Sequence, residues 1–310
     1  MHPRPRSSRL LLLGALPLLA ACGQEDRTFS TQTPEELAQV MPQLRPGDVL
    51  RHGPLSLVVP PAGEGLVMEA LFLDGHSEQL HVETDGAGRV ALGTRPTPPE
   101  PLSAGEHPTQ AAACNDGAYN LFPFKWRGTL HWRFNAGSTP AELTVDGAED
   151  KLRAAASNIT GGQNDCGLTD AIAASHSYEG RTTRSVAISP TNGCVGSERD
   201  GVNVVGFGDL QGGTLGLACT WYSGDGAALE SDIRLNKVDH VWTLNSESAG
   251  CSGRFGVEAV ATHEFGHAFG LGHVSEADHA ALTMSTAIAP CDASAATLGL
   301  GDVRGLRAKY

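Results

Sequence analysis

The run of residues 263–273 constrains this chain more than any other feature of its sequence. It reads His-Glu-Phe-Gly-His-Ala-Phe-Gly-Leu-Gly-His and ends a stretch, from about Gly256 to Phe269, with apolar residues at helical spacing. His263 and His267 are four residues apart, so they project from the same face of a helix. Two imidazoles at this spacing can reach one ion at the roughly 2.0–2.1 Å that zinc requires.

The rest of the run completes the predicted zinc site. Gly270 can adopt a positive φ and turn the chain sharply, so we expect His273 to return to the same ion. Three neutral imidazoles leave the fourth tetrahedral position of zinc for water, which is typical of a catalytic site. Glu264 faces the same cleft but is displaced from a ligand position. We therefore predict that it is the general base that accepts a proton from the zinc-bound water.

The first residues of the chain have the layout of a secretory signal. Three arginines precede the apolar run Leu10 to Ala21, which is too short for a permanent membrane span. The run ends in Leu-Ala-Ala-Cys22, which resembles the bacterial lipobox. That resemblance implies a signal peptide over 1–21, cleavage before Cys22 and a lipid on its sulfur. The alternative is an ordinary signal peptide with an incidental cysteine.

Charge and cysteine content limit the partners and the compartment. The formal net charge is −13, and removing the signal peptide takes away three arginines and no acid. Such an acidic surface argues against nucleic acid and against binding to anionic lipid through a basic patch. Six cysteines follow Cys22, all beyond residue 113, and in an exported protein they predict three disulfides. Their pairing stays open: Cys114, Cys166, Cys194, Cys219, Cys251 and Cys291.

The uneven cysteine distribution divides the chain. We predict a spacer over 22–45, a small cysteine-free β-rich module over 46–95, which is a propeptide or an accessory module, and a proline-rich linker over 96–113. Residues 114–310 are predicted to form the main domain, of the α+β class, with a twisted mixed sheet. Its expected strands are 129–135, 185–189, 202–207, 215–222 and 231–236, and its expected helices are 141–159 and 256–269.

The run His263 to His273 matches the metzincin zinc-peptidase pattern H-E-x-x-H-x-x-G-x-x-H. The chain most resembles the matrixins and their bacterial relatives within this clan, because Gly266 and Leu271 fit the matrixin helix. The tail from Leu298 to Tyr310 also looks like the matrixin closing helix. The resemblance implies a metzincin-like catalytic domain with a zinc-binding helix and a C-terminal helix. It further implies a methionine turn in which Met284 forms an apolar floor beneath the zinc ligands.

Some positions depart from the matrixin pattern. Val274 stands where matrixins have Ser, and Thr286 stands where Pro is common. No cysteine lies between residues 23 and 113, so the matrixin cysteine switch is missing and any latency must use other residues. The resemblance also implies structural calcium, for which Asp225, Glu230 and Asp232 are candidates; a solvated acidic loop is the alternative.

These features together predict a zinc-dependent endopeptidase of the bacterial cell envelope. It would cut extracellular or envelope proteins or peptides, held to the membrane by the lipid at Cys22, or secreted. The alternative is a non-catalytic, metal-stabilised envelope binding protein, in which residues 46–95 are the binding module. A binding protein has no need for a carboxylate at Glu264, which favours the enzyme.

Overall fold

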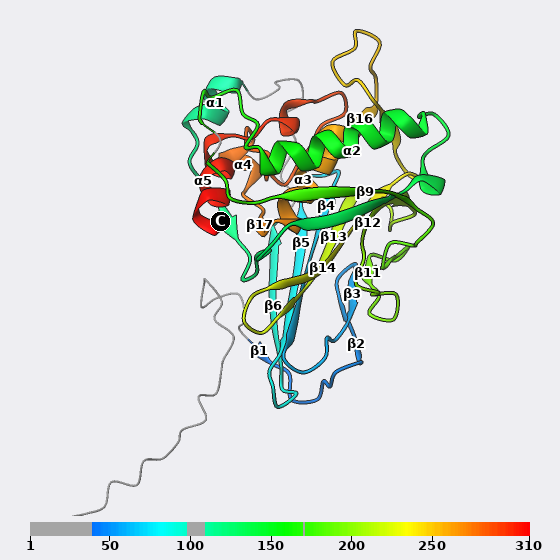
Figure 1. Ribbon diagram of the computed structural model, residues 1–310, viewed down its shortest axis with the longest axis vertical. Helices are drawn as coiled ribbons and strands as arrows, with labels where there is room; N and C mark the ends of the chain where they lie inside the picture. The colour runs from blue at the N-terminus through cyan, green and yellow to red at the C-terminus, as the bar shows by residue number, and fades with distance from the viewer. Residues whose placement is uncertain (1–38, 98–108, 170) are drawn as a thin grey trace, which may run out of the picture.

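The computed structural model describes residues 39–97, 109–169 and 171–310 (Figure 1). The predicted signal peptide, the lipidation site Cys22 and most of the predicted spacer lie outside these residues, as does the stretch 98–108 of the predicted linker. No helix within the described ranges is long and apolar enough to cross a bilayer.

The N-terminal part of the described chain consists of strands. They are β1 (Gln39–Val40), β2 (Val49–His52), β3 (Leu55–Val58), β4 (Glu64–Phe72), β5 (Ser77–Thr84) and β6 (Val90–Thr97). The turns between β4 and β5 and between β5 and β6 contain Gly75 and Gly88 at φ 78° and 79°. These are left-handed conformations that glycine adopts without strain.

The remaining strands and the helices follow from α1 onward. The strands are β7 (Asn120–Leu121), β8 (Leu130–Asn135), β9 (His176–Thr182), β10 (Ile188–Ser189), β11 (Gly193–Cys194), β12 (Asn203–Gly208), β13 (Thr214–Ser223), β14 (Ala228–Asn236), β15 (Val241–Thr243), β16 (Arg254–Gly256) and β17 (Leu271–Gly272). The helices are α1 (Gln110–Asn115), α2 (Val145–Thr160), α3 (Val257–Ala268), α4 (Glu276–His279) and α5 (Leu300–Lys309), with 3-10 turns at Ala136–Ser138 and Ser294–Ala296.

Among the described residues, nine strands form one mixed sheet in the order β1-β6-β5-β4-β13-β14-β12-β8-β9. Strands β14, β12, β8 and β9 run parallel, whereas β13 is antiparallel to β14 and β4 is antiparallel to β13. Figure 1 shows the helices gathered at one end of the molecule, with the hairpins of β4, β5 and β6 reaching toward the other end. The mixed α+β architecture with a C-terminal helix is the predicted one.

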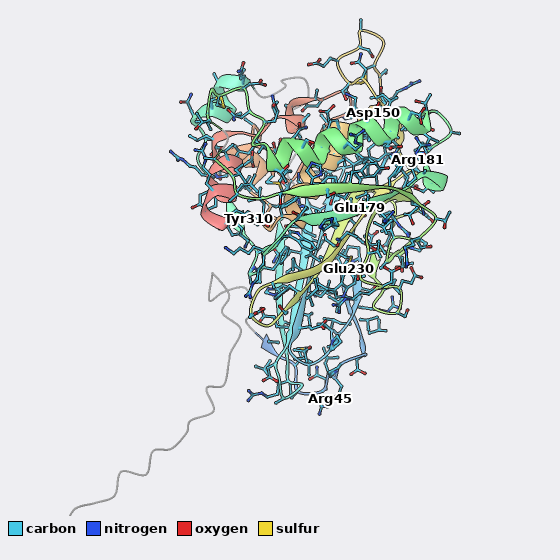
Figure 2. All side chains as sticks on the ribbon, in the orientation of Figure 1. Arg45, Asp150, Glu179, Arg181, Glu230 and Tyr310 are labelled. Atoms are coloured by element: carbon cyan, nitrogen blue, oxygen red, sulfur yellow. A yellow bond between two sulfur atoms is a disulfide. The ribbon has the colours of Figure 1, made fainter. Side chains whose placement is uncertain are left out.

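Helices α2 and α3 pack together against the sheet. Helix α2 begins where the Thr144 side chain accepts a hydrogen bond from Gly147, at 3.2 Å, a standard N-cap. It is joined to α3 by a hydrogen bond from Asn158 to Thr262 of 3.2 Å. Arg181 of β9, labelled beside α2 in Figure 2, ties the helix to the sheet edge through an ion pair with Glu149. Helix α3 lies in the interior, with nearly all of its residues buried, which explains why it is apolar around most of its circumference.

The N-terminal strands do not form a separate module. The sequence predicted a β-rich unit over 46–95, and its strands form, but β4 pairs with β13 along its whole length and so continues the main sheet. One apolar cluster contains side chains from both parts, including Leu66 and Met68 with Leu217 and Trp221. The predicted linker is also shorter than 96–113, because β6 extends to Thr97 and α1 begins at Gln110.

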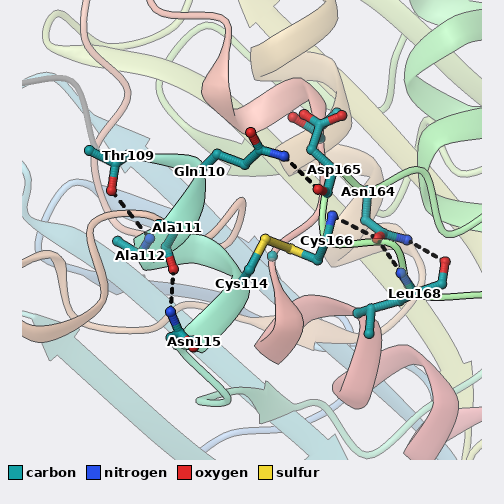
Figure 3. The surroundings of a disulfide bond; sticks show 12 residues. Thr109, Gln110, Ala111, Ala112, Cys114, Asn115, Asn164, Asp165, Cys166 and Leu168 are labelled. Carbon is teal, nitrogen blue, oxygen red and sulfur yellow. Dashed lines mark hydrogen bonds between the residues drawn. A yellow bond between two sulfur atoms is a disulfide. The ribbon is translucent and has the colours of Figure 1, made fainter.

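The six cysteines form three disulfides, as the sequence predicted, and the structure supplies the pairing that the sequence left open. Cys114 of α1 is bonded to Cys166, which holds α1 beside the loop that follows α2 (Figure 3). The Gln110 amide donates a hydrogen bond to the carbonyl of Asp165 in the same place. The other two pairs are Cys194–Cys219 and Cys251–Cys291.

Candidate metal centre

Helix α3 and the turn that follows it place three imidazoles together. Gly270 has φ 90°, and its N–H donates to the carbonyl of His267 at 2.9 Å, so the helix ends in a left-handed turn. The chain then forms β17, whose Leu271 pairs with Leu121 of β7. This short pairing fixes the backbone that carries His273.

The Nε2 atoms of the three histidines converge on one point. Nε2 of His263 lies 2.7 Å from Nε2 of His273, and Nε2 of His267 lies 3.1 Å from each of them. Nδ1 of His263 donates to the carbonyl of Thr283 at 2.7 Å, and Nδ1 of His267 donates to the carbonyl of Leu271 at 2.9 Å. With Nδ1 protonated, each Nε2 presents a lone pair to the shared point. Three such nitrogen atoms facing one another can hold a cation between them.

These histidines also have the electrostatic state that a metal requires. All three side chains are buried, and burial lowers the pKa of His263 and His267 well below the ordinary value. Burial lowers the pKa of His273 to about 3. The imidazoles are therefore neutral at neutral pH, the form in which histidine binds zinc. Within the described residues, these three histidines are the group of His, Cys, Asp or Glu side chains that lie close enough together to share one metal ion.

Glu264 lies beside this group without a hydrogen-bonding partner. The side chain is fully buried, and neither carboxylate oxygen forms a hydrogen bond within the described residues. It lies against Gly216 of β13, where a Cβ atom would be 2.2 Å from Oε1 of Glu264. Burial raises the pKa of Glu264 well above its ordinary value, and the nearby carboxylate of Glu69 raises it further. A buried, unpartnered acid in such a place points to a chemical role.

Met284 packs against helix α3 at Gly266. A Cβ atom on Gly266 would be 2.3 Å from its sulfur, so the glycine allows the thioether to approach the helix backbone. The carbonyl of Met284 accepts a hydrogen bond from Val274 at 2.9 Å. The turn that carries Met284 is thus connected to the residue after His273.

Glu69 of β4 is a site residue that the sequence interpretation missed. Its Oε1 lies 2.8 Å from Nδ1 of His273, its Oε2 lies 3.3 Å from Nδ1 of His267, and the residue is 1% exposed. The one signal in the sequence is an acid within the otherwise apolar run from Gly65 to Phe72. A charged residue inside such a strand calls for a partner, but it does not say which one.

The candidate calcium ligands do not form a site. Asp225 pairs with Arg127 at 2.9 Å. Glu230, labelled on β14 in Figure 2, and Asp232 each accept hydrogen bonds from backbone N–H groups. These carboxylates brace loops against the sheet, and the predicted calcium has no support.

Comparison with known proteins agrees with this geometry over the C-terminal part of the chain. Residues 203–310 match the family model of the matrixins, a family of metallopeptidases. The matched range begins at β12 and contains the three histidines, Glu264, Met284 and helix α5. No curated protein matches the chain. The match supports a matrixin-like metallopeptidase domain with a catalytic zinc site, and it does not extend to the N-terminal strands.

Proposed function

We propose that this protein is a zinc-dependent endopeptidase, with His263, His267 and His273 as the zinc ligands and Glu264 as the general base. The observation that carries the proposal is the buried, unpartnered carboxylate of Glu264 beside three convergent imidazoles. A metal site that only stabilises a fold is closed by its ligands and has no use for such a group. The matrixin match over residues 203–310 supports the same chemistry.

Zinc held by these three nitrogens would act as a Lewis acid and lower the pKa of a coordinated water molecule toward 7. Glu264 then has two tasks. It accepts the proton as a peptide carbonyl is attacked, and it delivers that proton to the leaving amine.

The second part of the proposal concerns location and substrate. We place the protein at the bacterial cell envelope, held by a lipid on Cys22 or secreted, with extracellular or envelope proteins as substrates. The support is the signal-like N-terminus, the acidic net charge of −13 and the three disulfides. Labelled palmitate fed to expressing cells should enter the wild-type protein and should not enter a Cys22→Ala variant.

The test of the enzymatic proposal is hydrolysis of a peptide library by the zinc-loaded protein, with and without a chelator. We expect cleavage that stops on chelation and returns with zinc. Zinc-loaded protein that cleaves no peptide would favour the non-catalytic binding protein.

A further inference from the structure

Strand β7 and the residue after it lie between the turn that carries His273 and the last turn of helix α5. Leu121 of β7 pairs with Leu271 of β17. The backbone N–H of Phe122 donates to the carbonyl of Gly270 at 2.9 Å. Helix α5 contacts both β7 and β17, and Figure 1 shows the end of this helix beside β17. The position of the turn that carries the third histidine therefore depends on where β7 is held.

A side chain of β7 also bonds directly to the backbone of this histidine. The Asn120 amide donates to the carbonyl of His273 at 2.5 Å. Asn120 lies opposite Gly272 in the register, and a Cβ atom on this glycine would be 3.3 Å from the Phe122 ring. The two segments are thus closely packed as well as hydrogen-bonded. A shift of β7 would move the backbone of His273 with it.

Lys309, in the last turn of α5, is a buried lysine that contacts both sides of this arrangement. It is 6% exposed. Its ammonium donates to the carbonyl of Phe122 and lies 5.8 Å from the centre of the Phe124 ring, within the range of a cation–π contact. A Cβ atom on Gly270 would be 2.6 Å from Cε of Lys309 and 3.3 Å from Nζ, so the lysine also lies against the turn itself. Lysine is rarely buried to this extent unless its charge has partners.

The neighbours of Lys309 are bonded to the end of helix α3. Tyr310, labelled in Figure 2, donates from its hydroxyl to the carbonyl of Phe269 at 3.1 Å. The same hydroxyl accepts from the backbone N–H of Trp126 at 3.2 Å, and the Trp126 indole donates to the carbonyl of Ala268 at 2.8 Å. The carbonyls at the end of a helix have no partner within it, so these bonds complete α3 where the turn toward the third histidine begins. Lys309 therefore lies inside a hydrogen-bonded unit that includes this turn.

The hydrogen bond to Phe122 distinguishes Lys309 from a residue that only fills space. An apolar side chain could pack in the same place, but it has no proton to donate to the Phe122 carbonyl and no charge for the Phe124 ring. The backbone of Phe122 accepts from Lys309 through its carbonyl and donates to Gly270 through its N–H. The lysine is therefore connected to the turn through one residue of backbone, and its ammonium fixes where that residue lies.

We propose that Lys309 is a positioning residue for the metal centre. Its ammonium fixes the backbone at Phe122, and β7 in turn fixes His273 at the point that it shares with the other two histidines. Lys309 acts through β7 and not as a ligand. The inference rests on the proposed function, because the ion concerned is the zinc that the three histidines would hold.

The test uses the full chain with cobalt in the metal site, because the visible spectrum of cobalt reports the arrangement of its ligands without requiring catalysis. Lys309→Met keeps a long side chain and removes the ammonium, whereas Lys309→Arg keeps a charged donor. Arg304→Met removes a positive charge from an exposed position of the same helix and is the matched control. The spectrum, the rate of cobalt release to a chelating dye and the circular dichroism are measured for each variant.

We expect Lys309→Met to keep the fold, to change the cobalt spectrum and to release cobalt about 10-fold faster, in line with the usual contribution of groups that orient metal ligands. Lys309→Arg should remain close to the wild type in both measurements, as should Arg304→Met. A wild-type spectrum and release rate for Lys309→Met would overturn the proposal. Equal changes in Arg304→Met would also overturn it, because the effect would then come from the charge of the helix and not from the contact with Phe122.

A double-mutant cycle tests the connection through β7. Asn120→Ala removes the amide that bonds to the carbonyl of His273 and leaves Lys309 in place. We expect this variant also to release cobalt faster. In the double variant with Lys309→Met, the acceleration should be smaller than the product of the two single effects, because both residues act on the same turn. Independent effects would contradict the path through β7. Lys309→Gln, which is neutral and shorter but still polar, replaces Lys309→Met throughout if the latter does not fold.

Peptide hydrolysis by the zinc-loaded forms is measured in parallel, so that the two proposals can fail separately. If the cobalt spectrum and release change as expected but no form cleaves a peptide, the peptidase proposal fails and the positioning role of Lys309 stands. If peptides are cleaved while Lys309→Met leaves the cobalt centre unchanged, the positioning role fails alone.

Discussion

Asp302 accepts a hydrogen bond from the backbone N–H of Thr283, at 2.9 Å, through its Oδ2 atom. The carbonyl oxygen of the same Thr283 accepts the Nδ1 proton of His263 at 2.7 Å. The closing helix α5 thus reaches the first zinc ligand through one residue of the methionine turn. Asp302 also accepts from Gly299 at 2.9 Å and from Met284 at 3.3 Å, so one carboxylate joins the start of α5 to the floor of the centre.

Replacing Asp302 by Asn should weaken zinc binding. The amide keeps one acceptor oxygen, so at least one of the three backbone N–H groups that now bond to the carboxylate loses its partner. We expect about a 10-fold faster release of zinc to a chelating dye, because groups that orient metal ligands typically contribute roughly 10–100-fold to affinity. Asp278→Asn, at an exposed position of α4, is the matched control. Zinc release at the wild-type rate would show that Asp302 does not orient His263.

The same carboxyl group should make the folded protein less stable as the pH rises, whereas most paired carboxylates have the opposite effect. Burial raises the pKa of Asp302 from 3.8 to about 6, so the folded state keeps this proton to higher pH than the unfolded state. Its contribution to the free energy of unfolding is therefore greatest below pH 4 and declines as the pH rises through 6. At about 1.4 kcal/mol per pKa unit, the decline is about 3 kcal/mol.

This decline is measured by urea unfolding of the zinc-free wild type and Asp302→Asn between pH 4 and pH 7. Zinc-free protein is used so that metal loss in acid does not enter the comparison. The wild type should lose stability relative to the variant as the pH rises. A difference that stays constant, or that grows with pH, would show that burial does not govern the titration of Asp302.

Gly270 should tolerate no side chain. Its φ of 90° is strained for any other residue, and a Cβ atom would be 2.8 Å from the carbonyl oxygen of Phe124 and 2.6 Å from Cε of Lys309. We expect Gly270→Ala to lower the free energy of unfolding by about 1–3 kcal/mol and to weaken zinc binding, because the turn carries His273. Gly250→Ala, where a Cβ meets no atom within 4 Å, should be neutral. Thermal unfolding of both variants measures the loss of stability, and zinc titration measures the loss of zinc affinity.

The metal centre was predictable because its geometry is local. The spacing of His263 and His267 on one helix, with Gly270 after it, places the ligands within a short stretch of chain, and the structure brings His273 to the same point. Helix α3 and most strands of the C-terminal part were likewise found within a few residues of their bounds. The closing helix followed from the matrixin-like tail.

The position of the N-terminal strands was not predictable in the same way. Apolar spacing shows that Glu64–Phe72 is a strand, but it does not specify a partner about 150 residues further along the chain, which depends on non-local pairing. The absence of cysteines favoured a separate module. It shows only that this stretch forms no disulfides, and it does not indicate which strands pair with it. Glu69 gave the one hint, as an acid in an apolar strand. Its partners, the imidazoles of His267 and His273, became visible only in the fold.

Hydrolysis of a fluorogenic peptide by the wild type and by Glu264→Gln, at equal zinc content, tests the central claim most directly. The amide has nearly the same shape but cannot accept the proton. We expect the variant to keep one zinc ion per chain and to lose activity by about 10²–10⁴-fold, the usual contribution of a general base. Glu258→Gln, on the same helix but paired with Lys151, should remain active. Hydrolysis by Glu264→Gln at the wild-type rate would contradict the account.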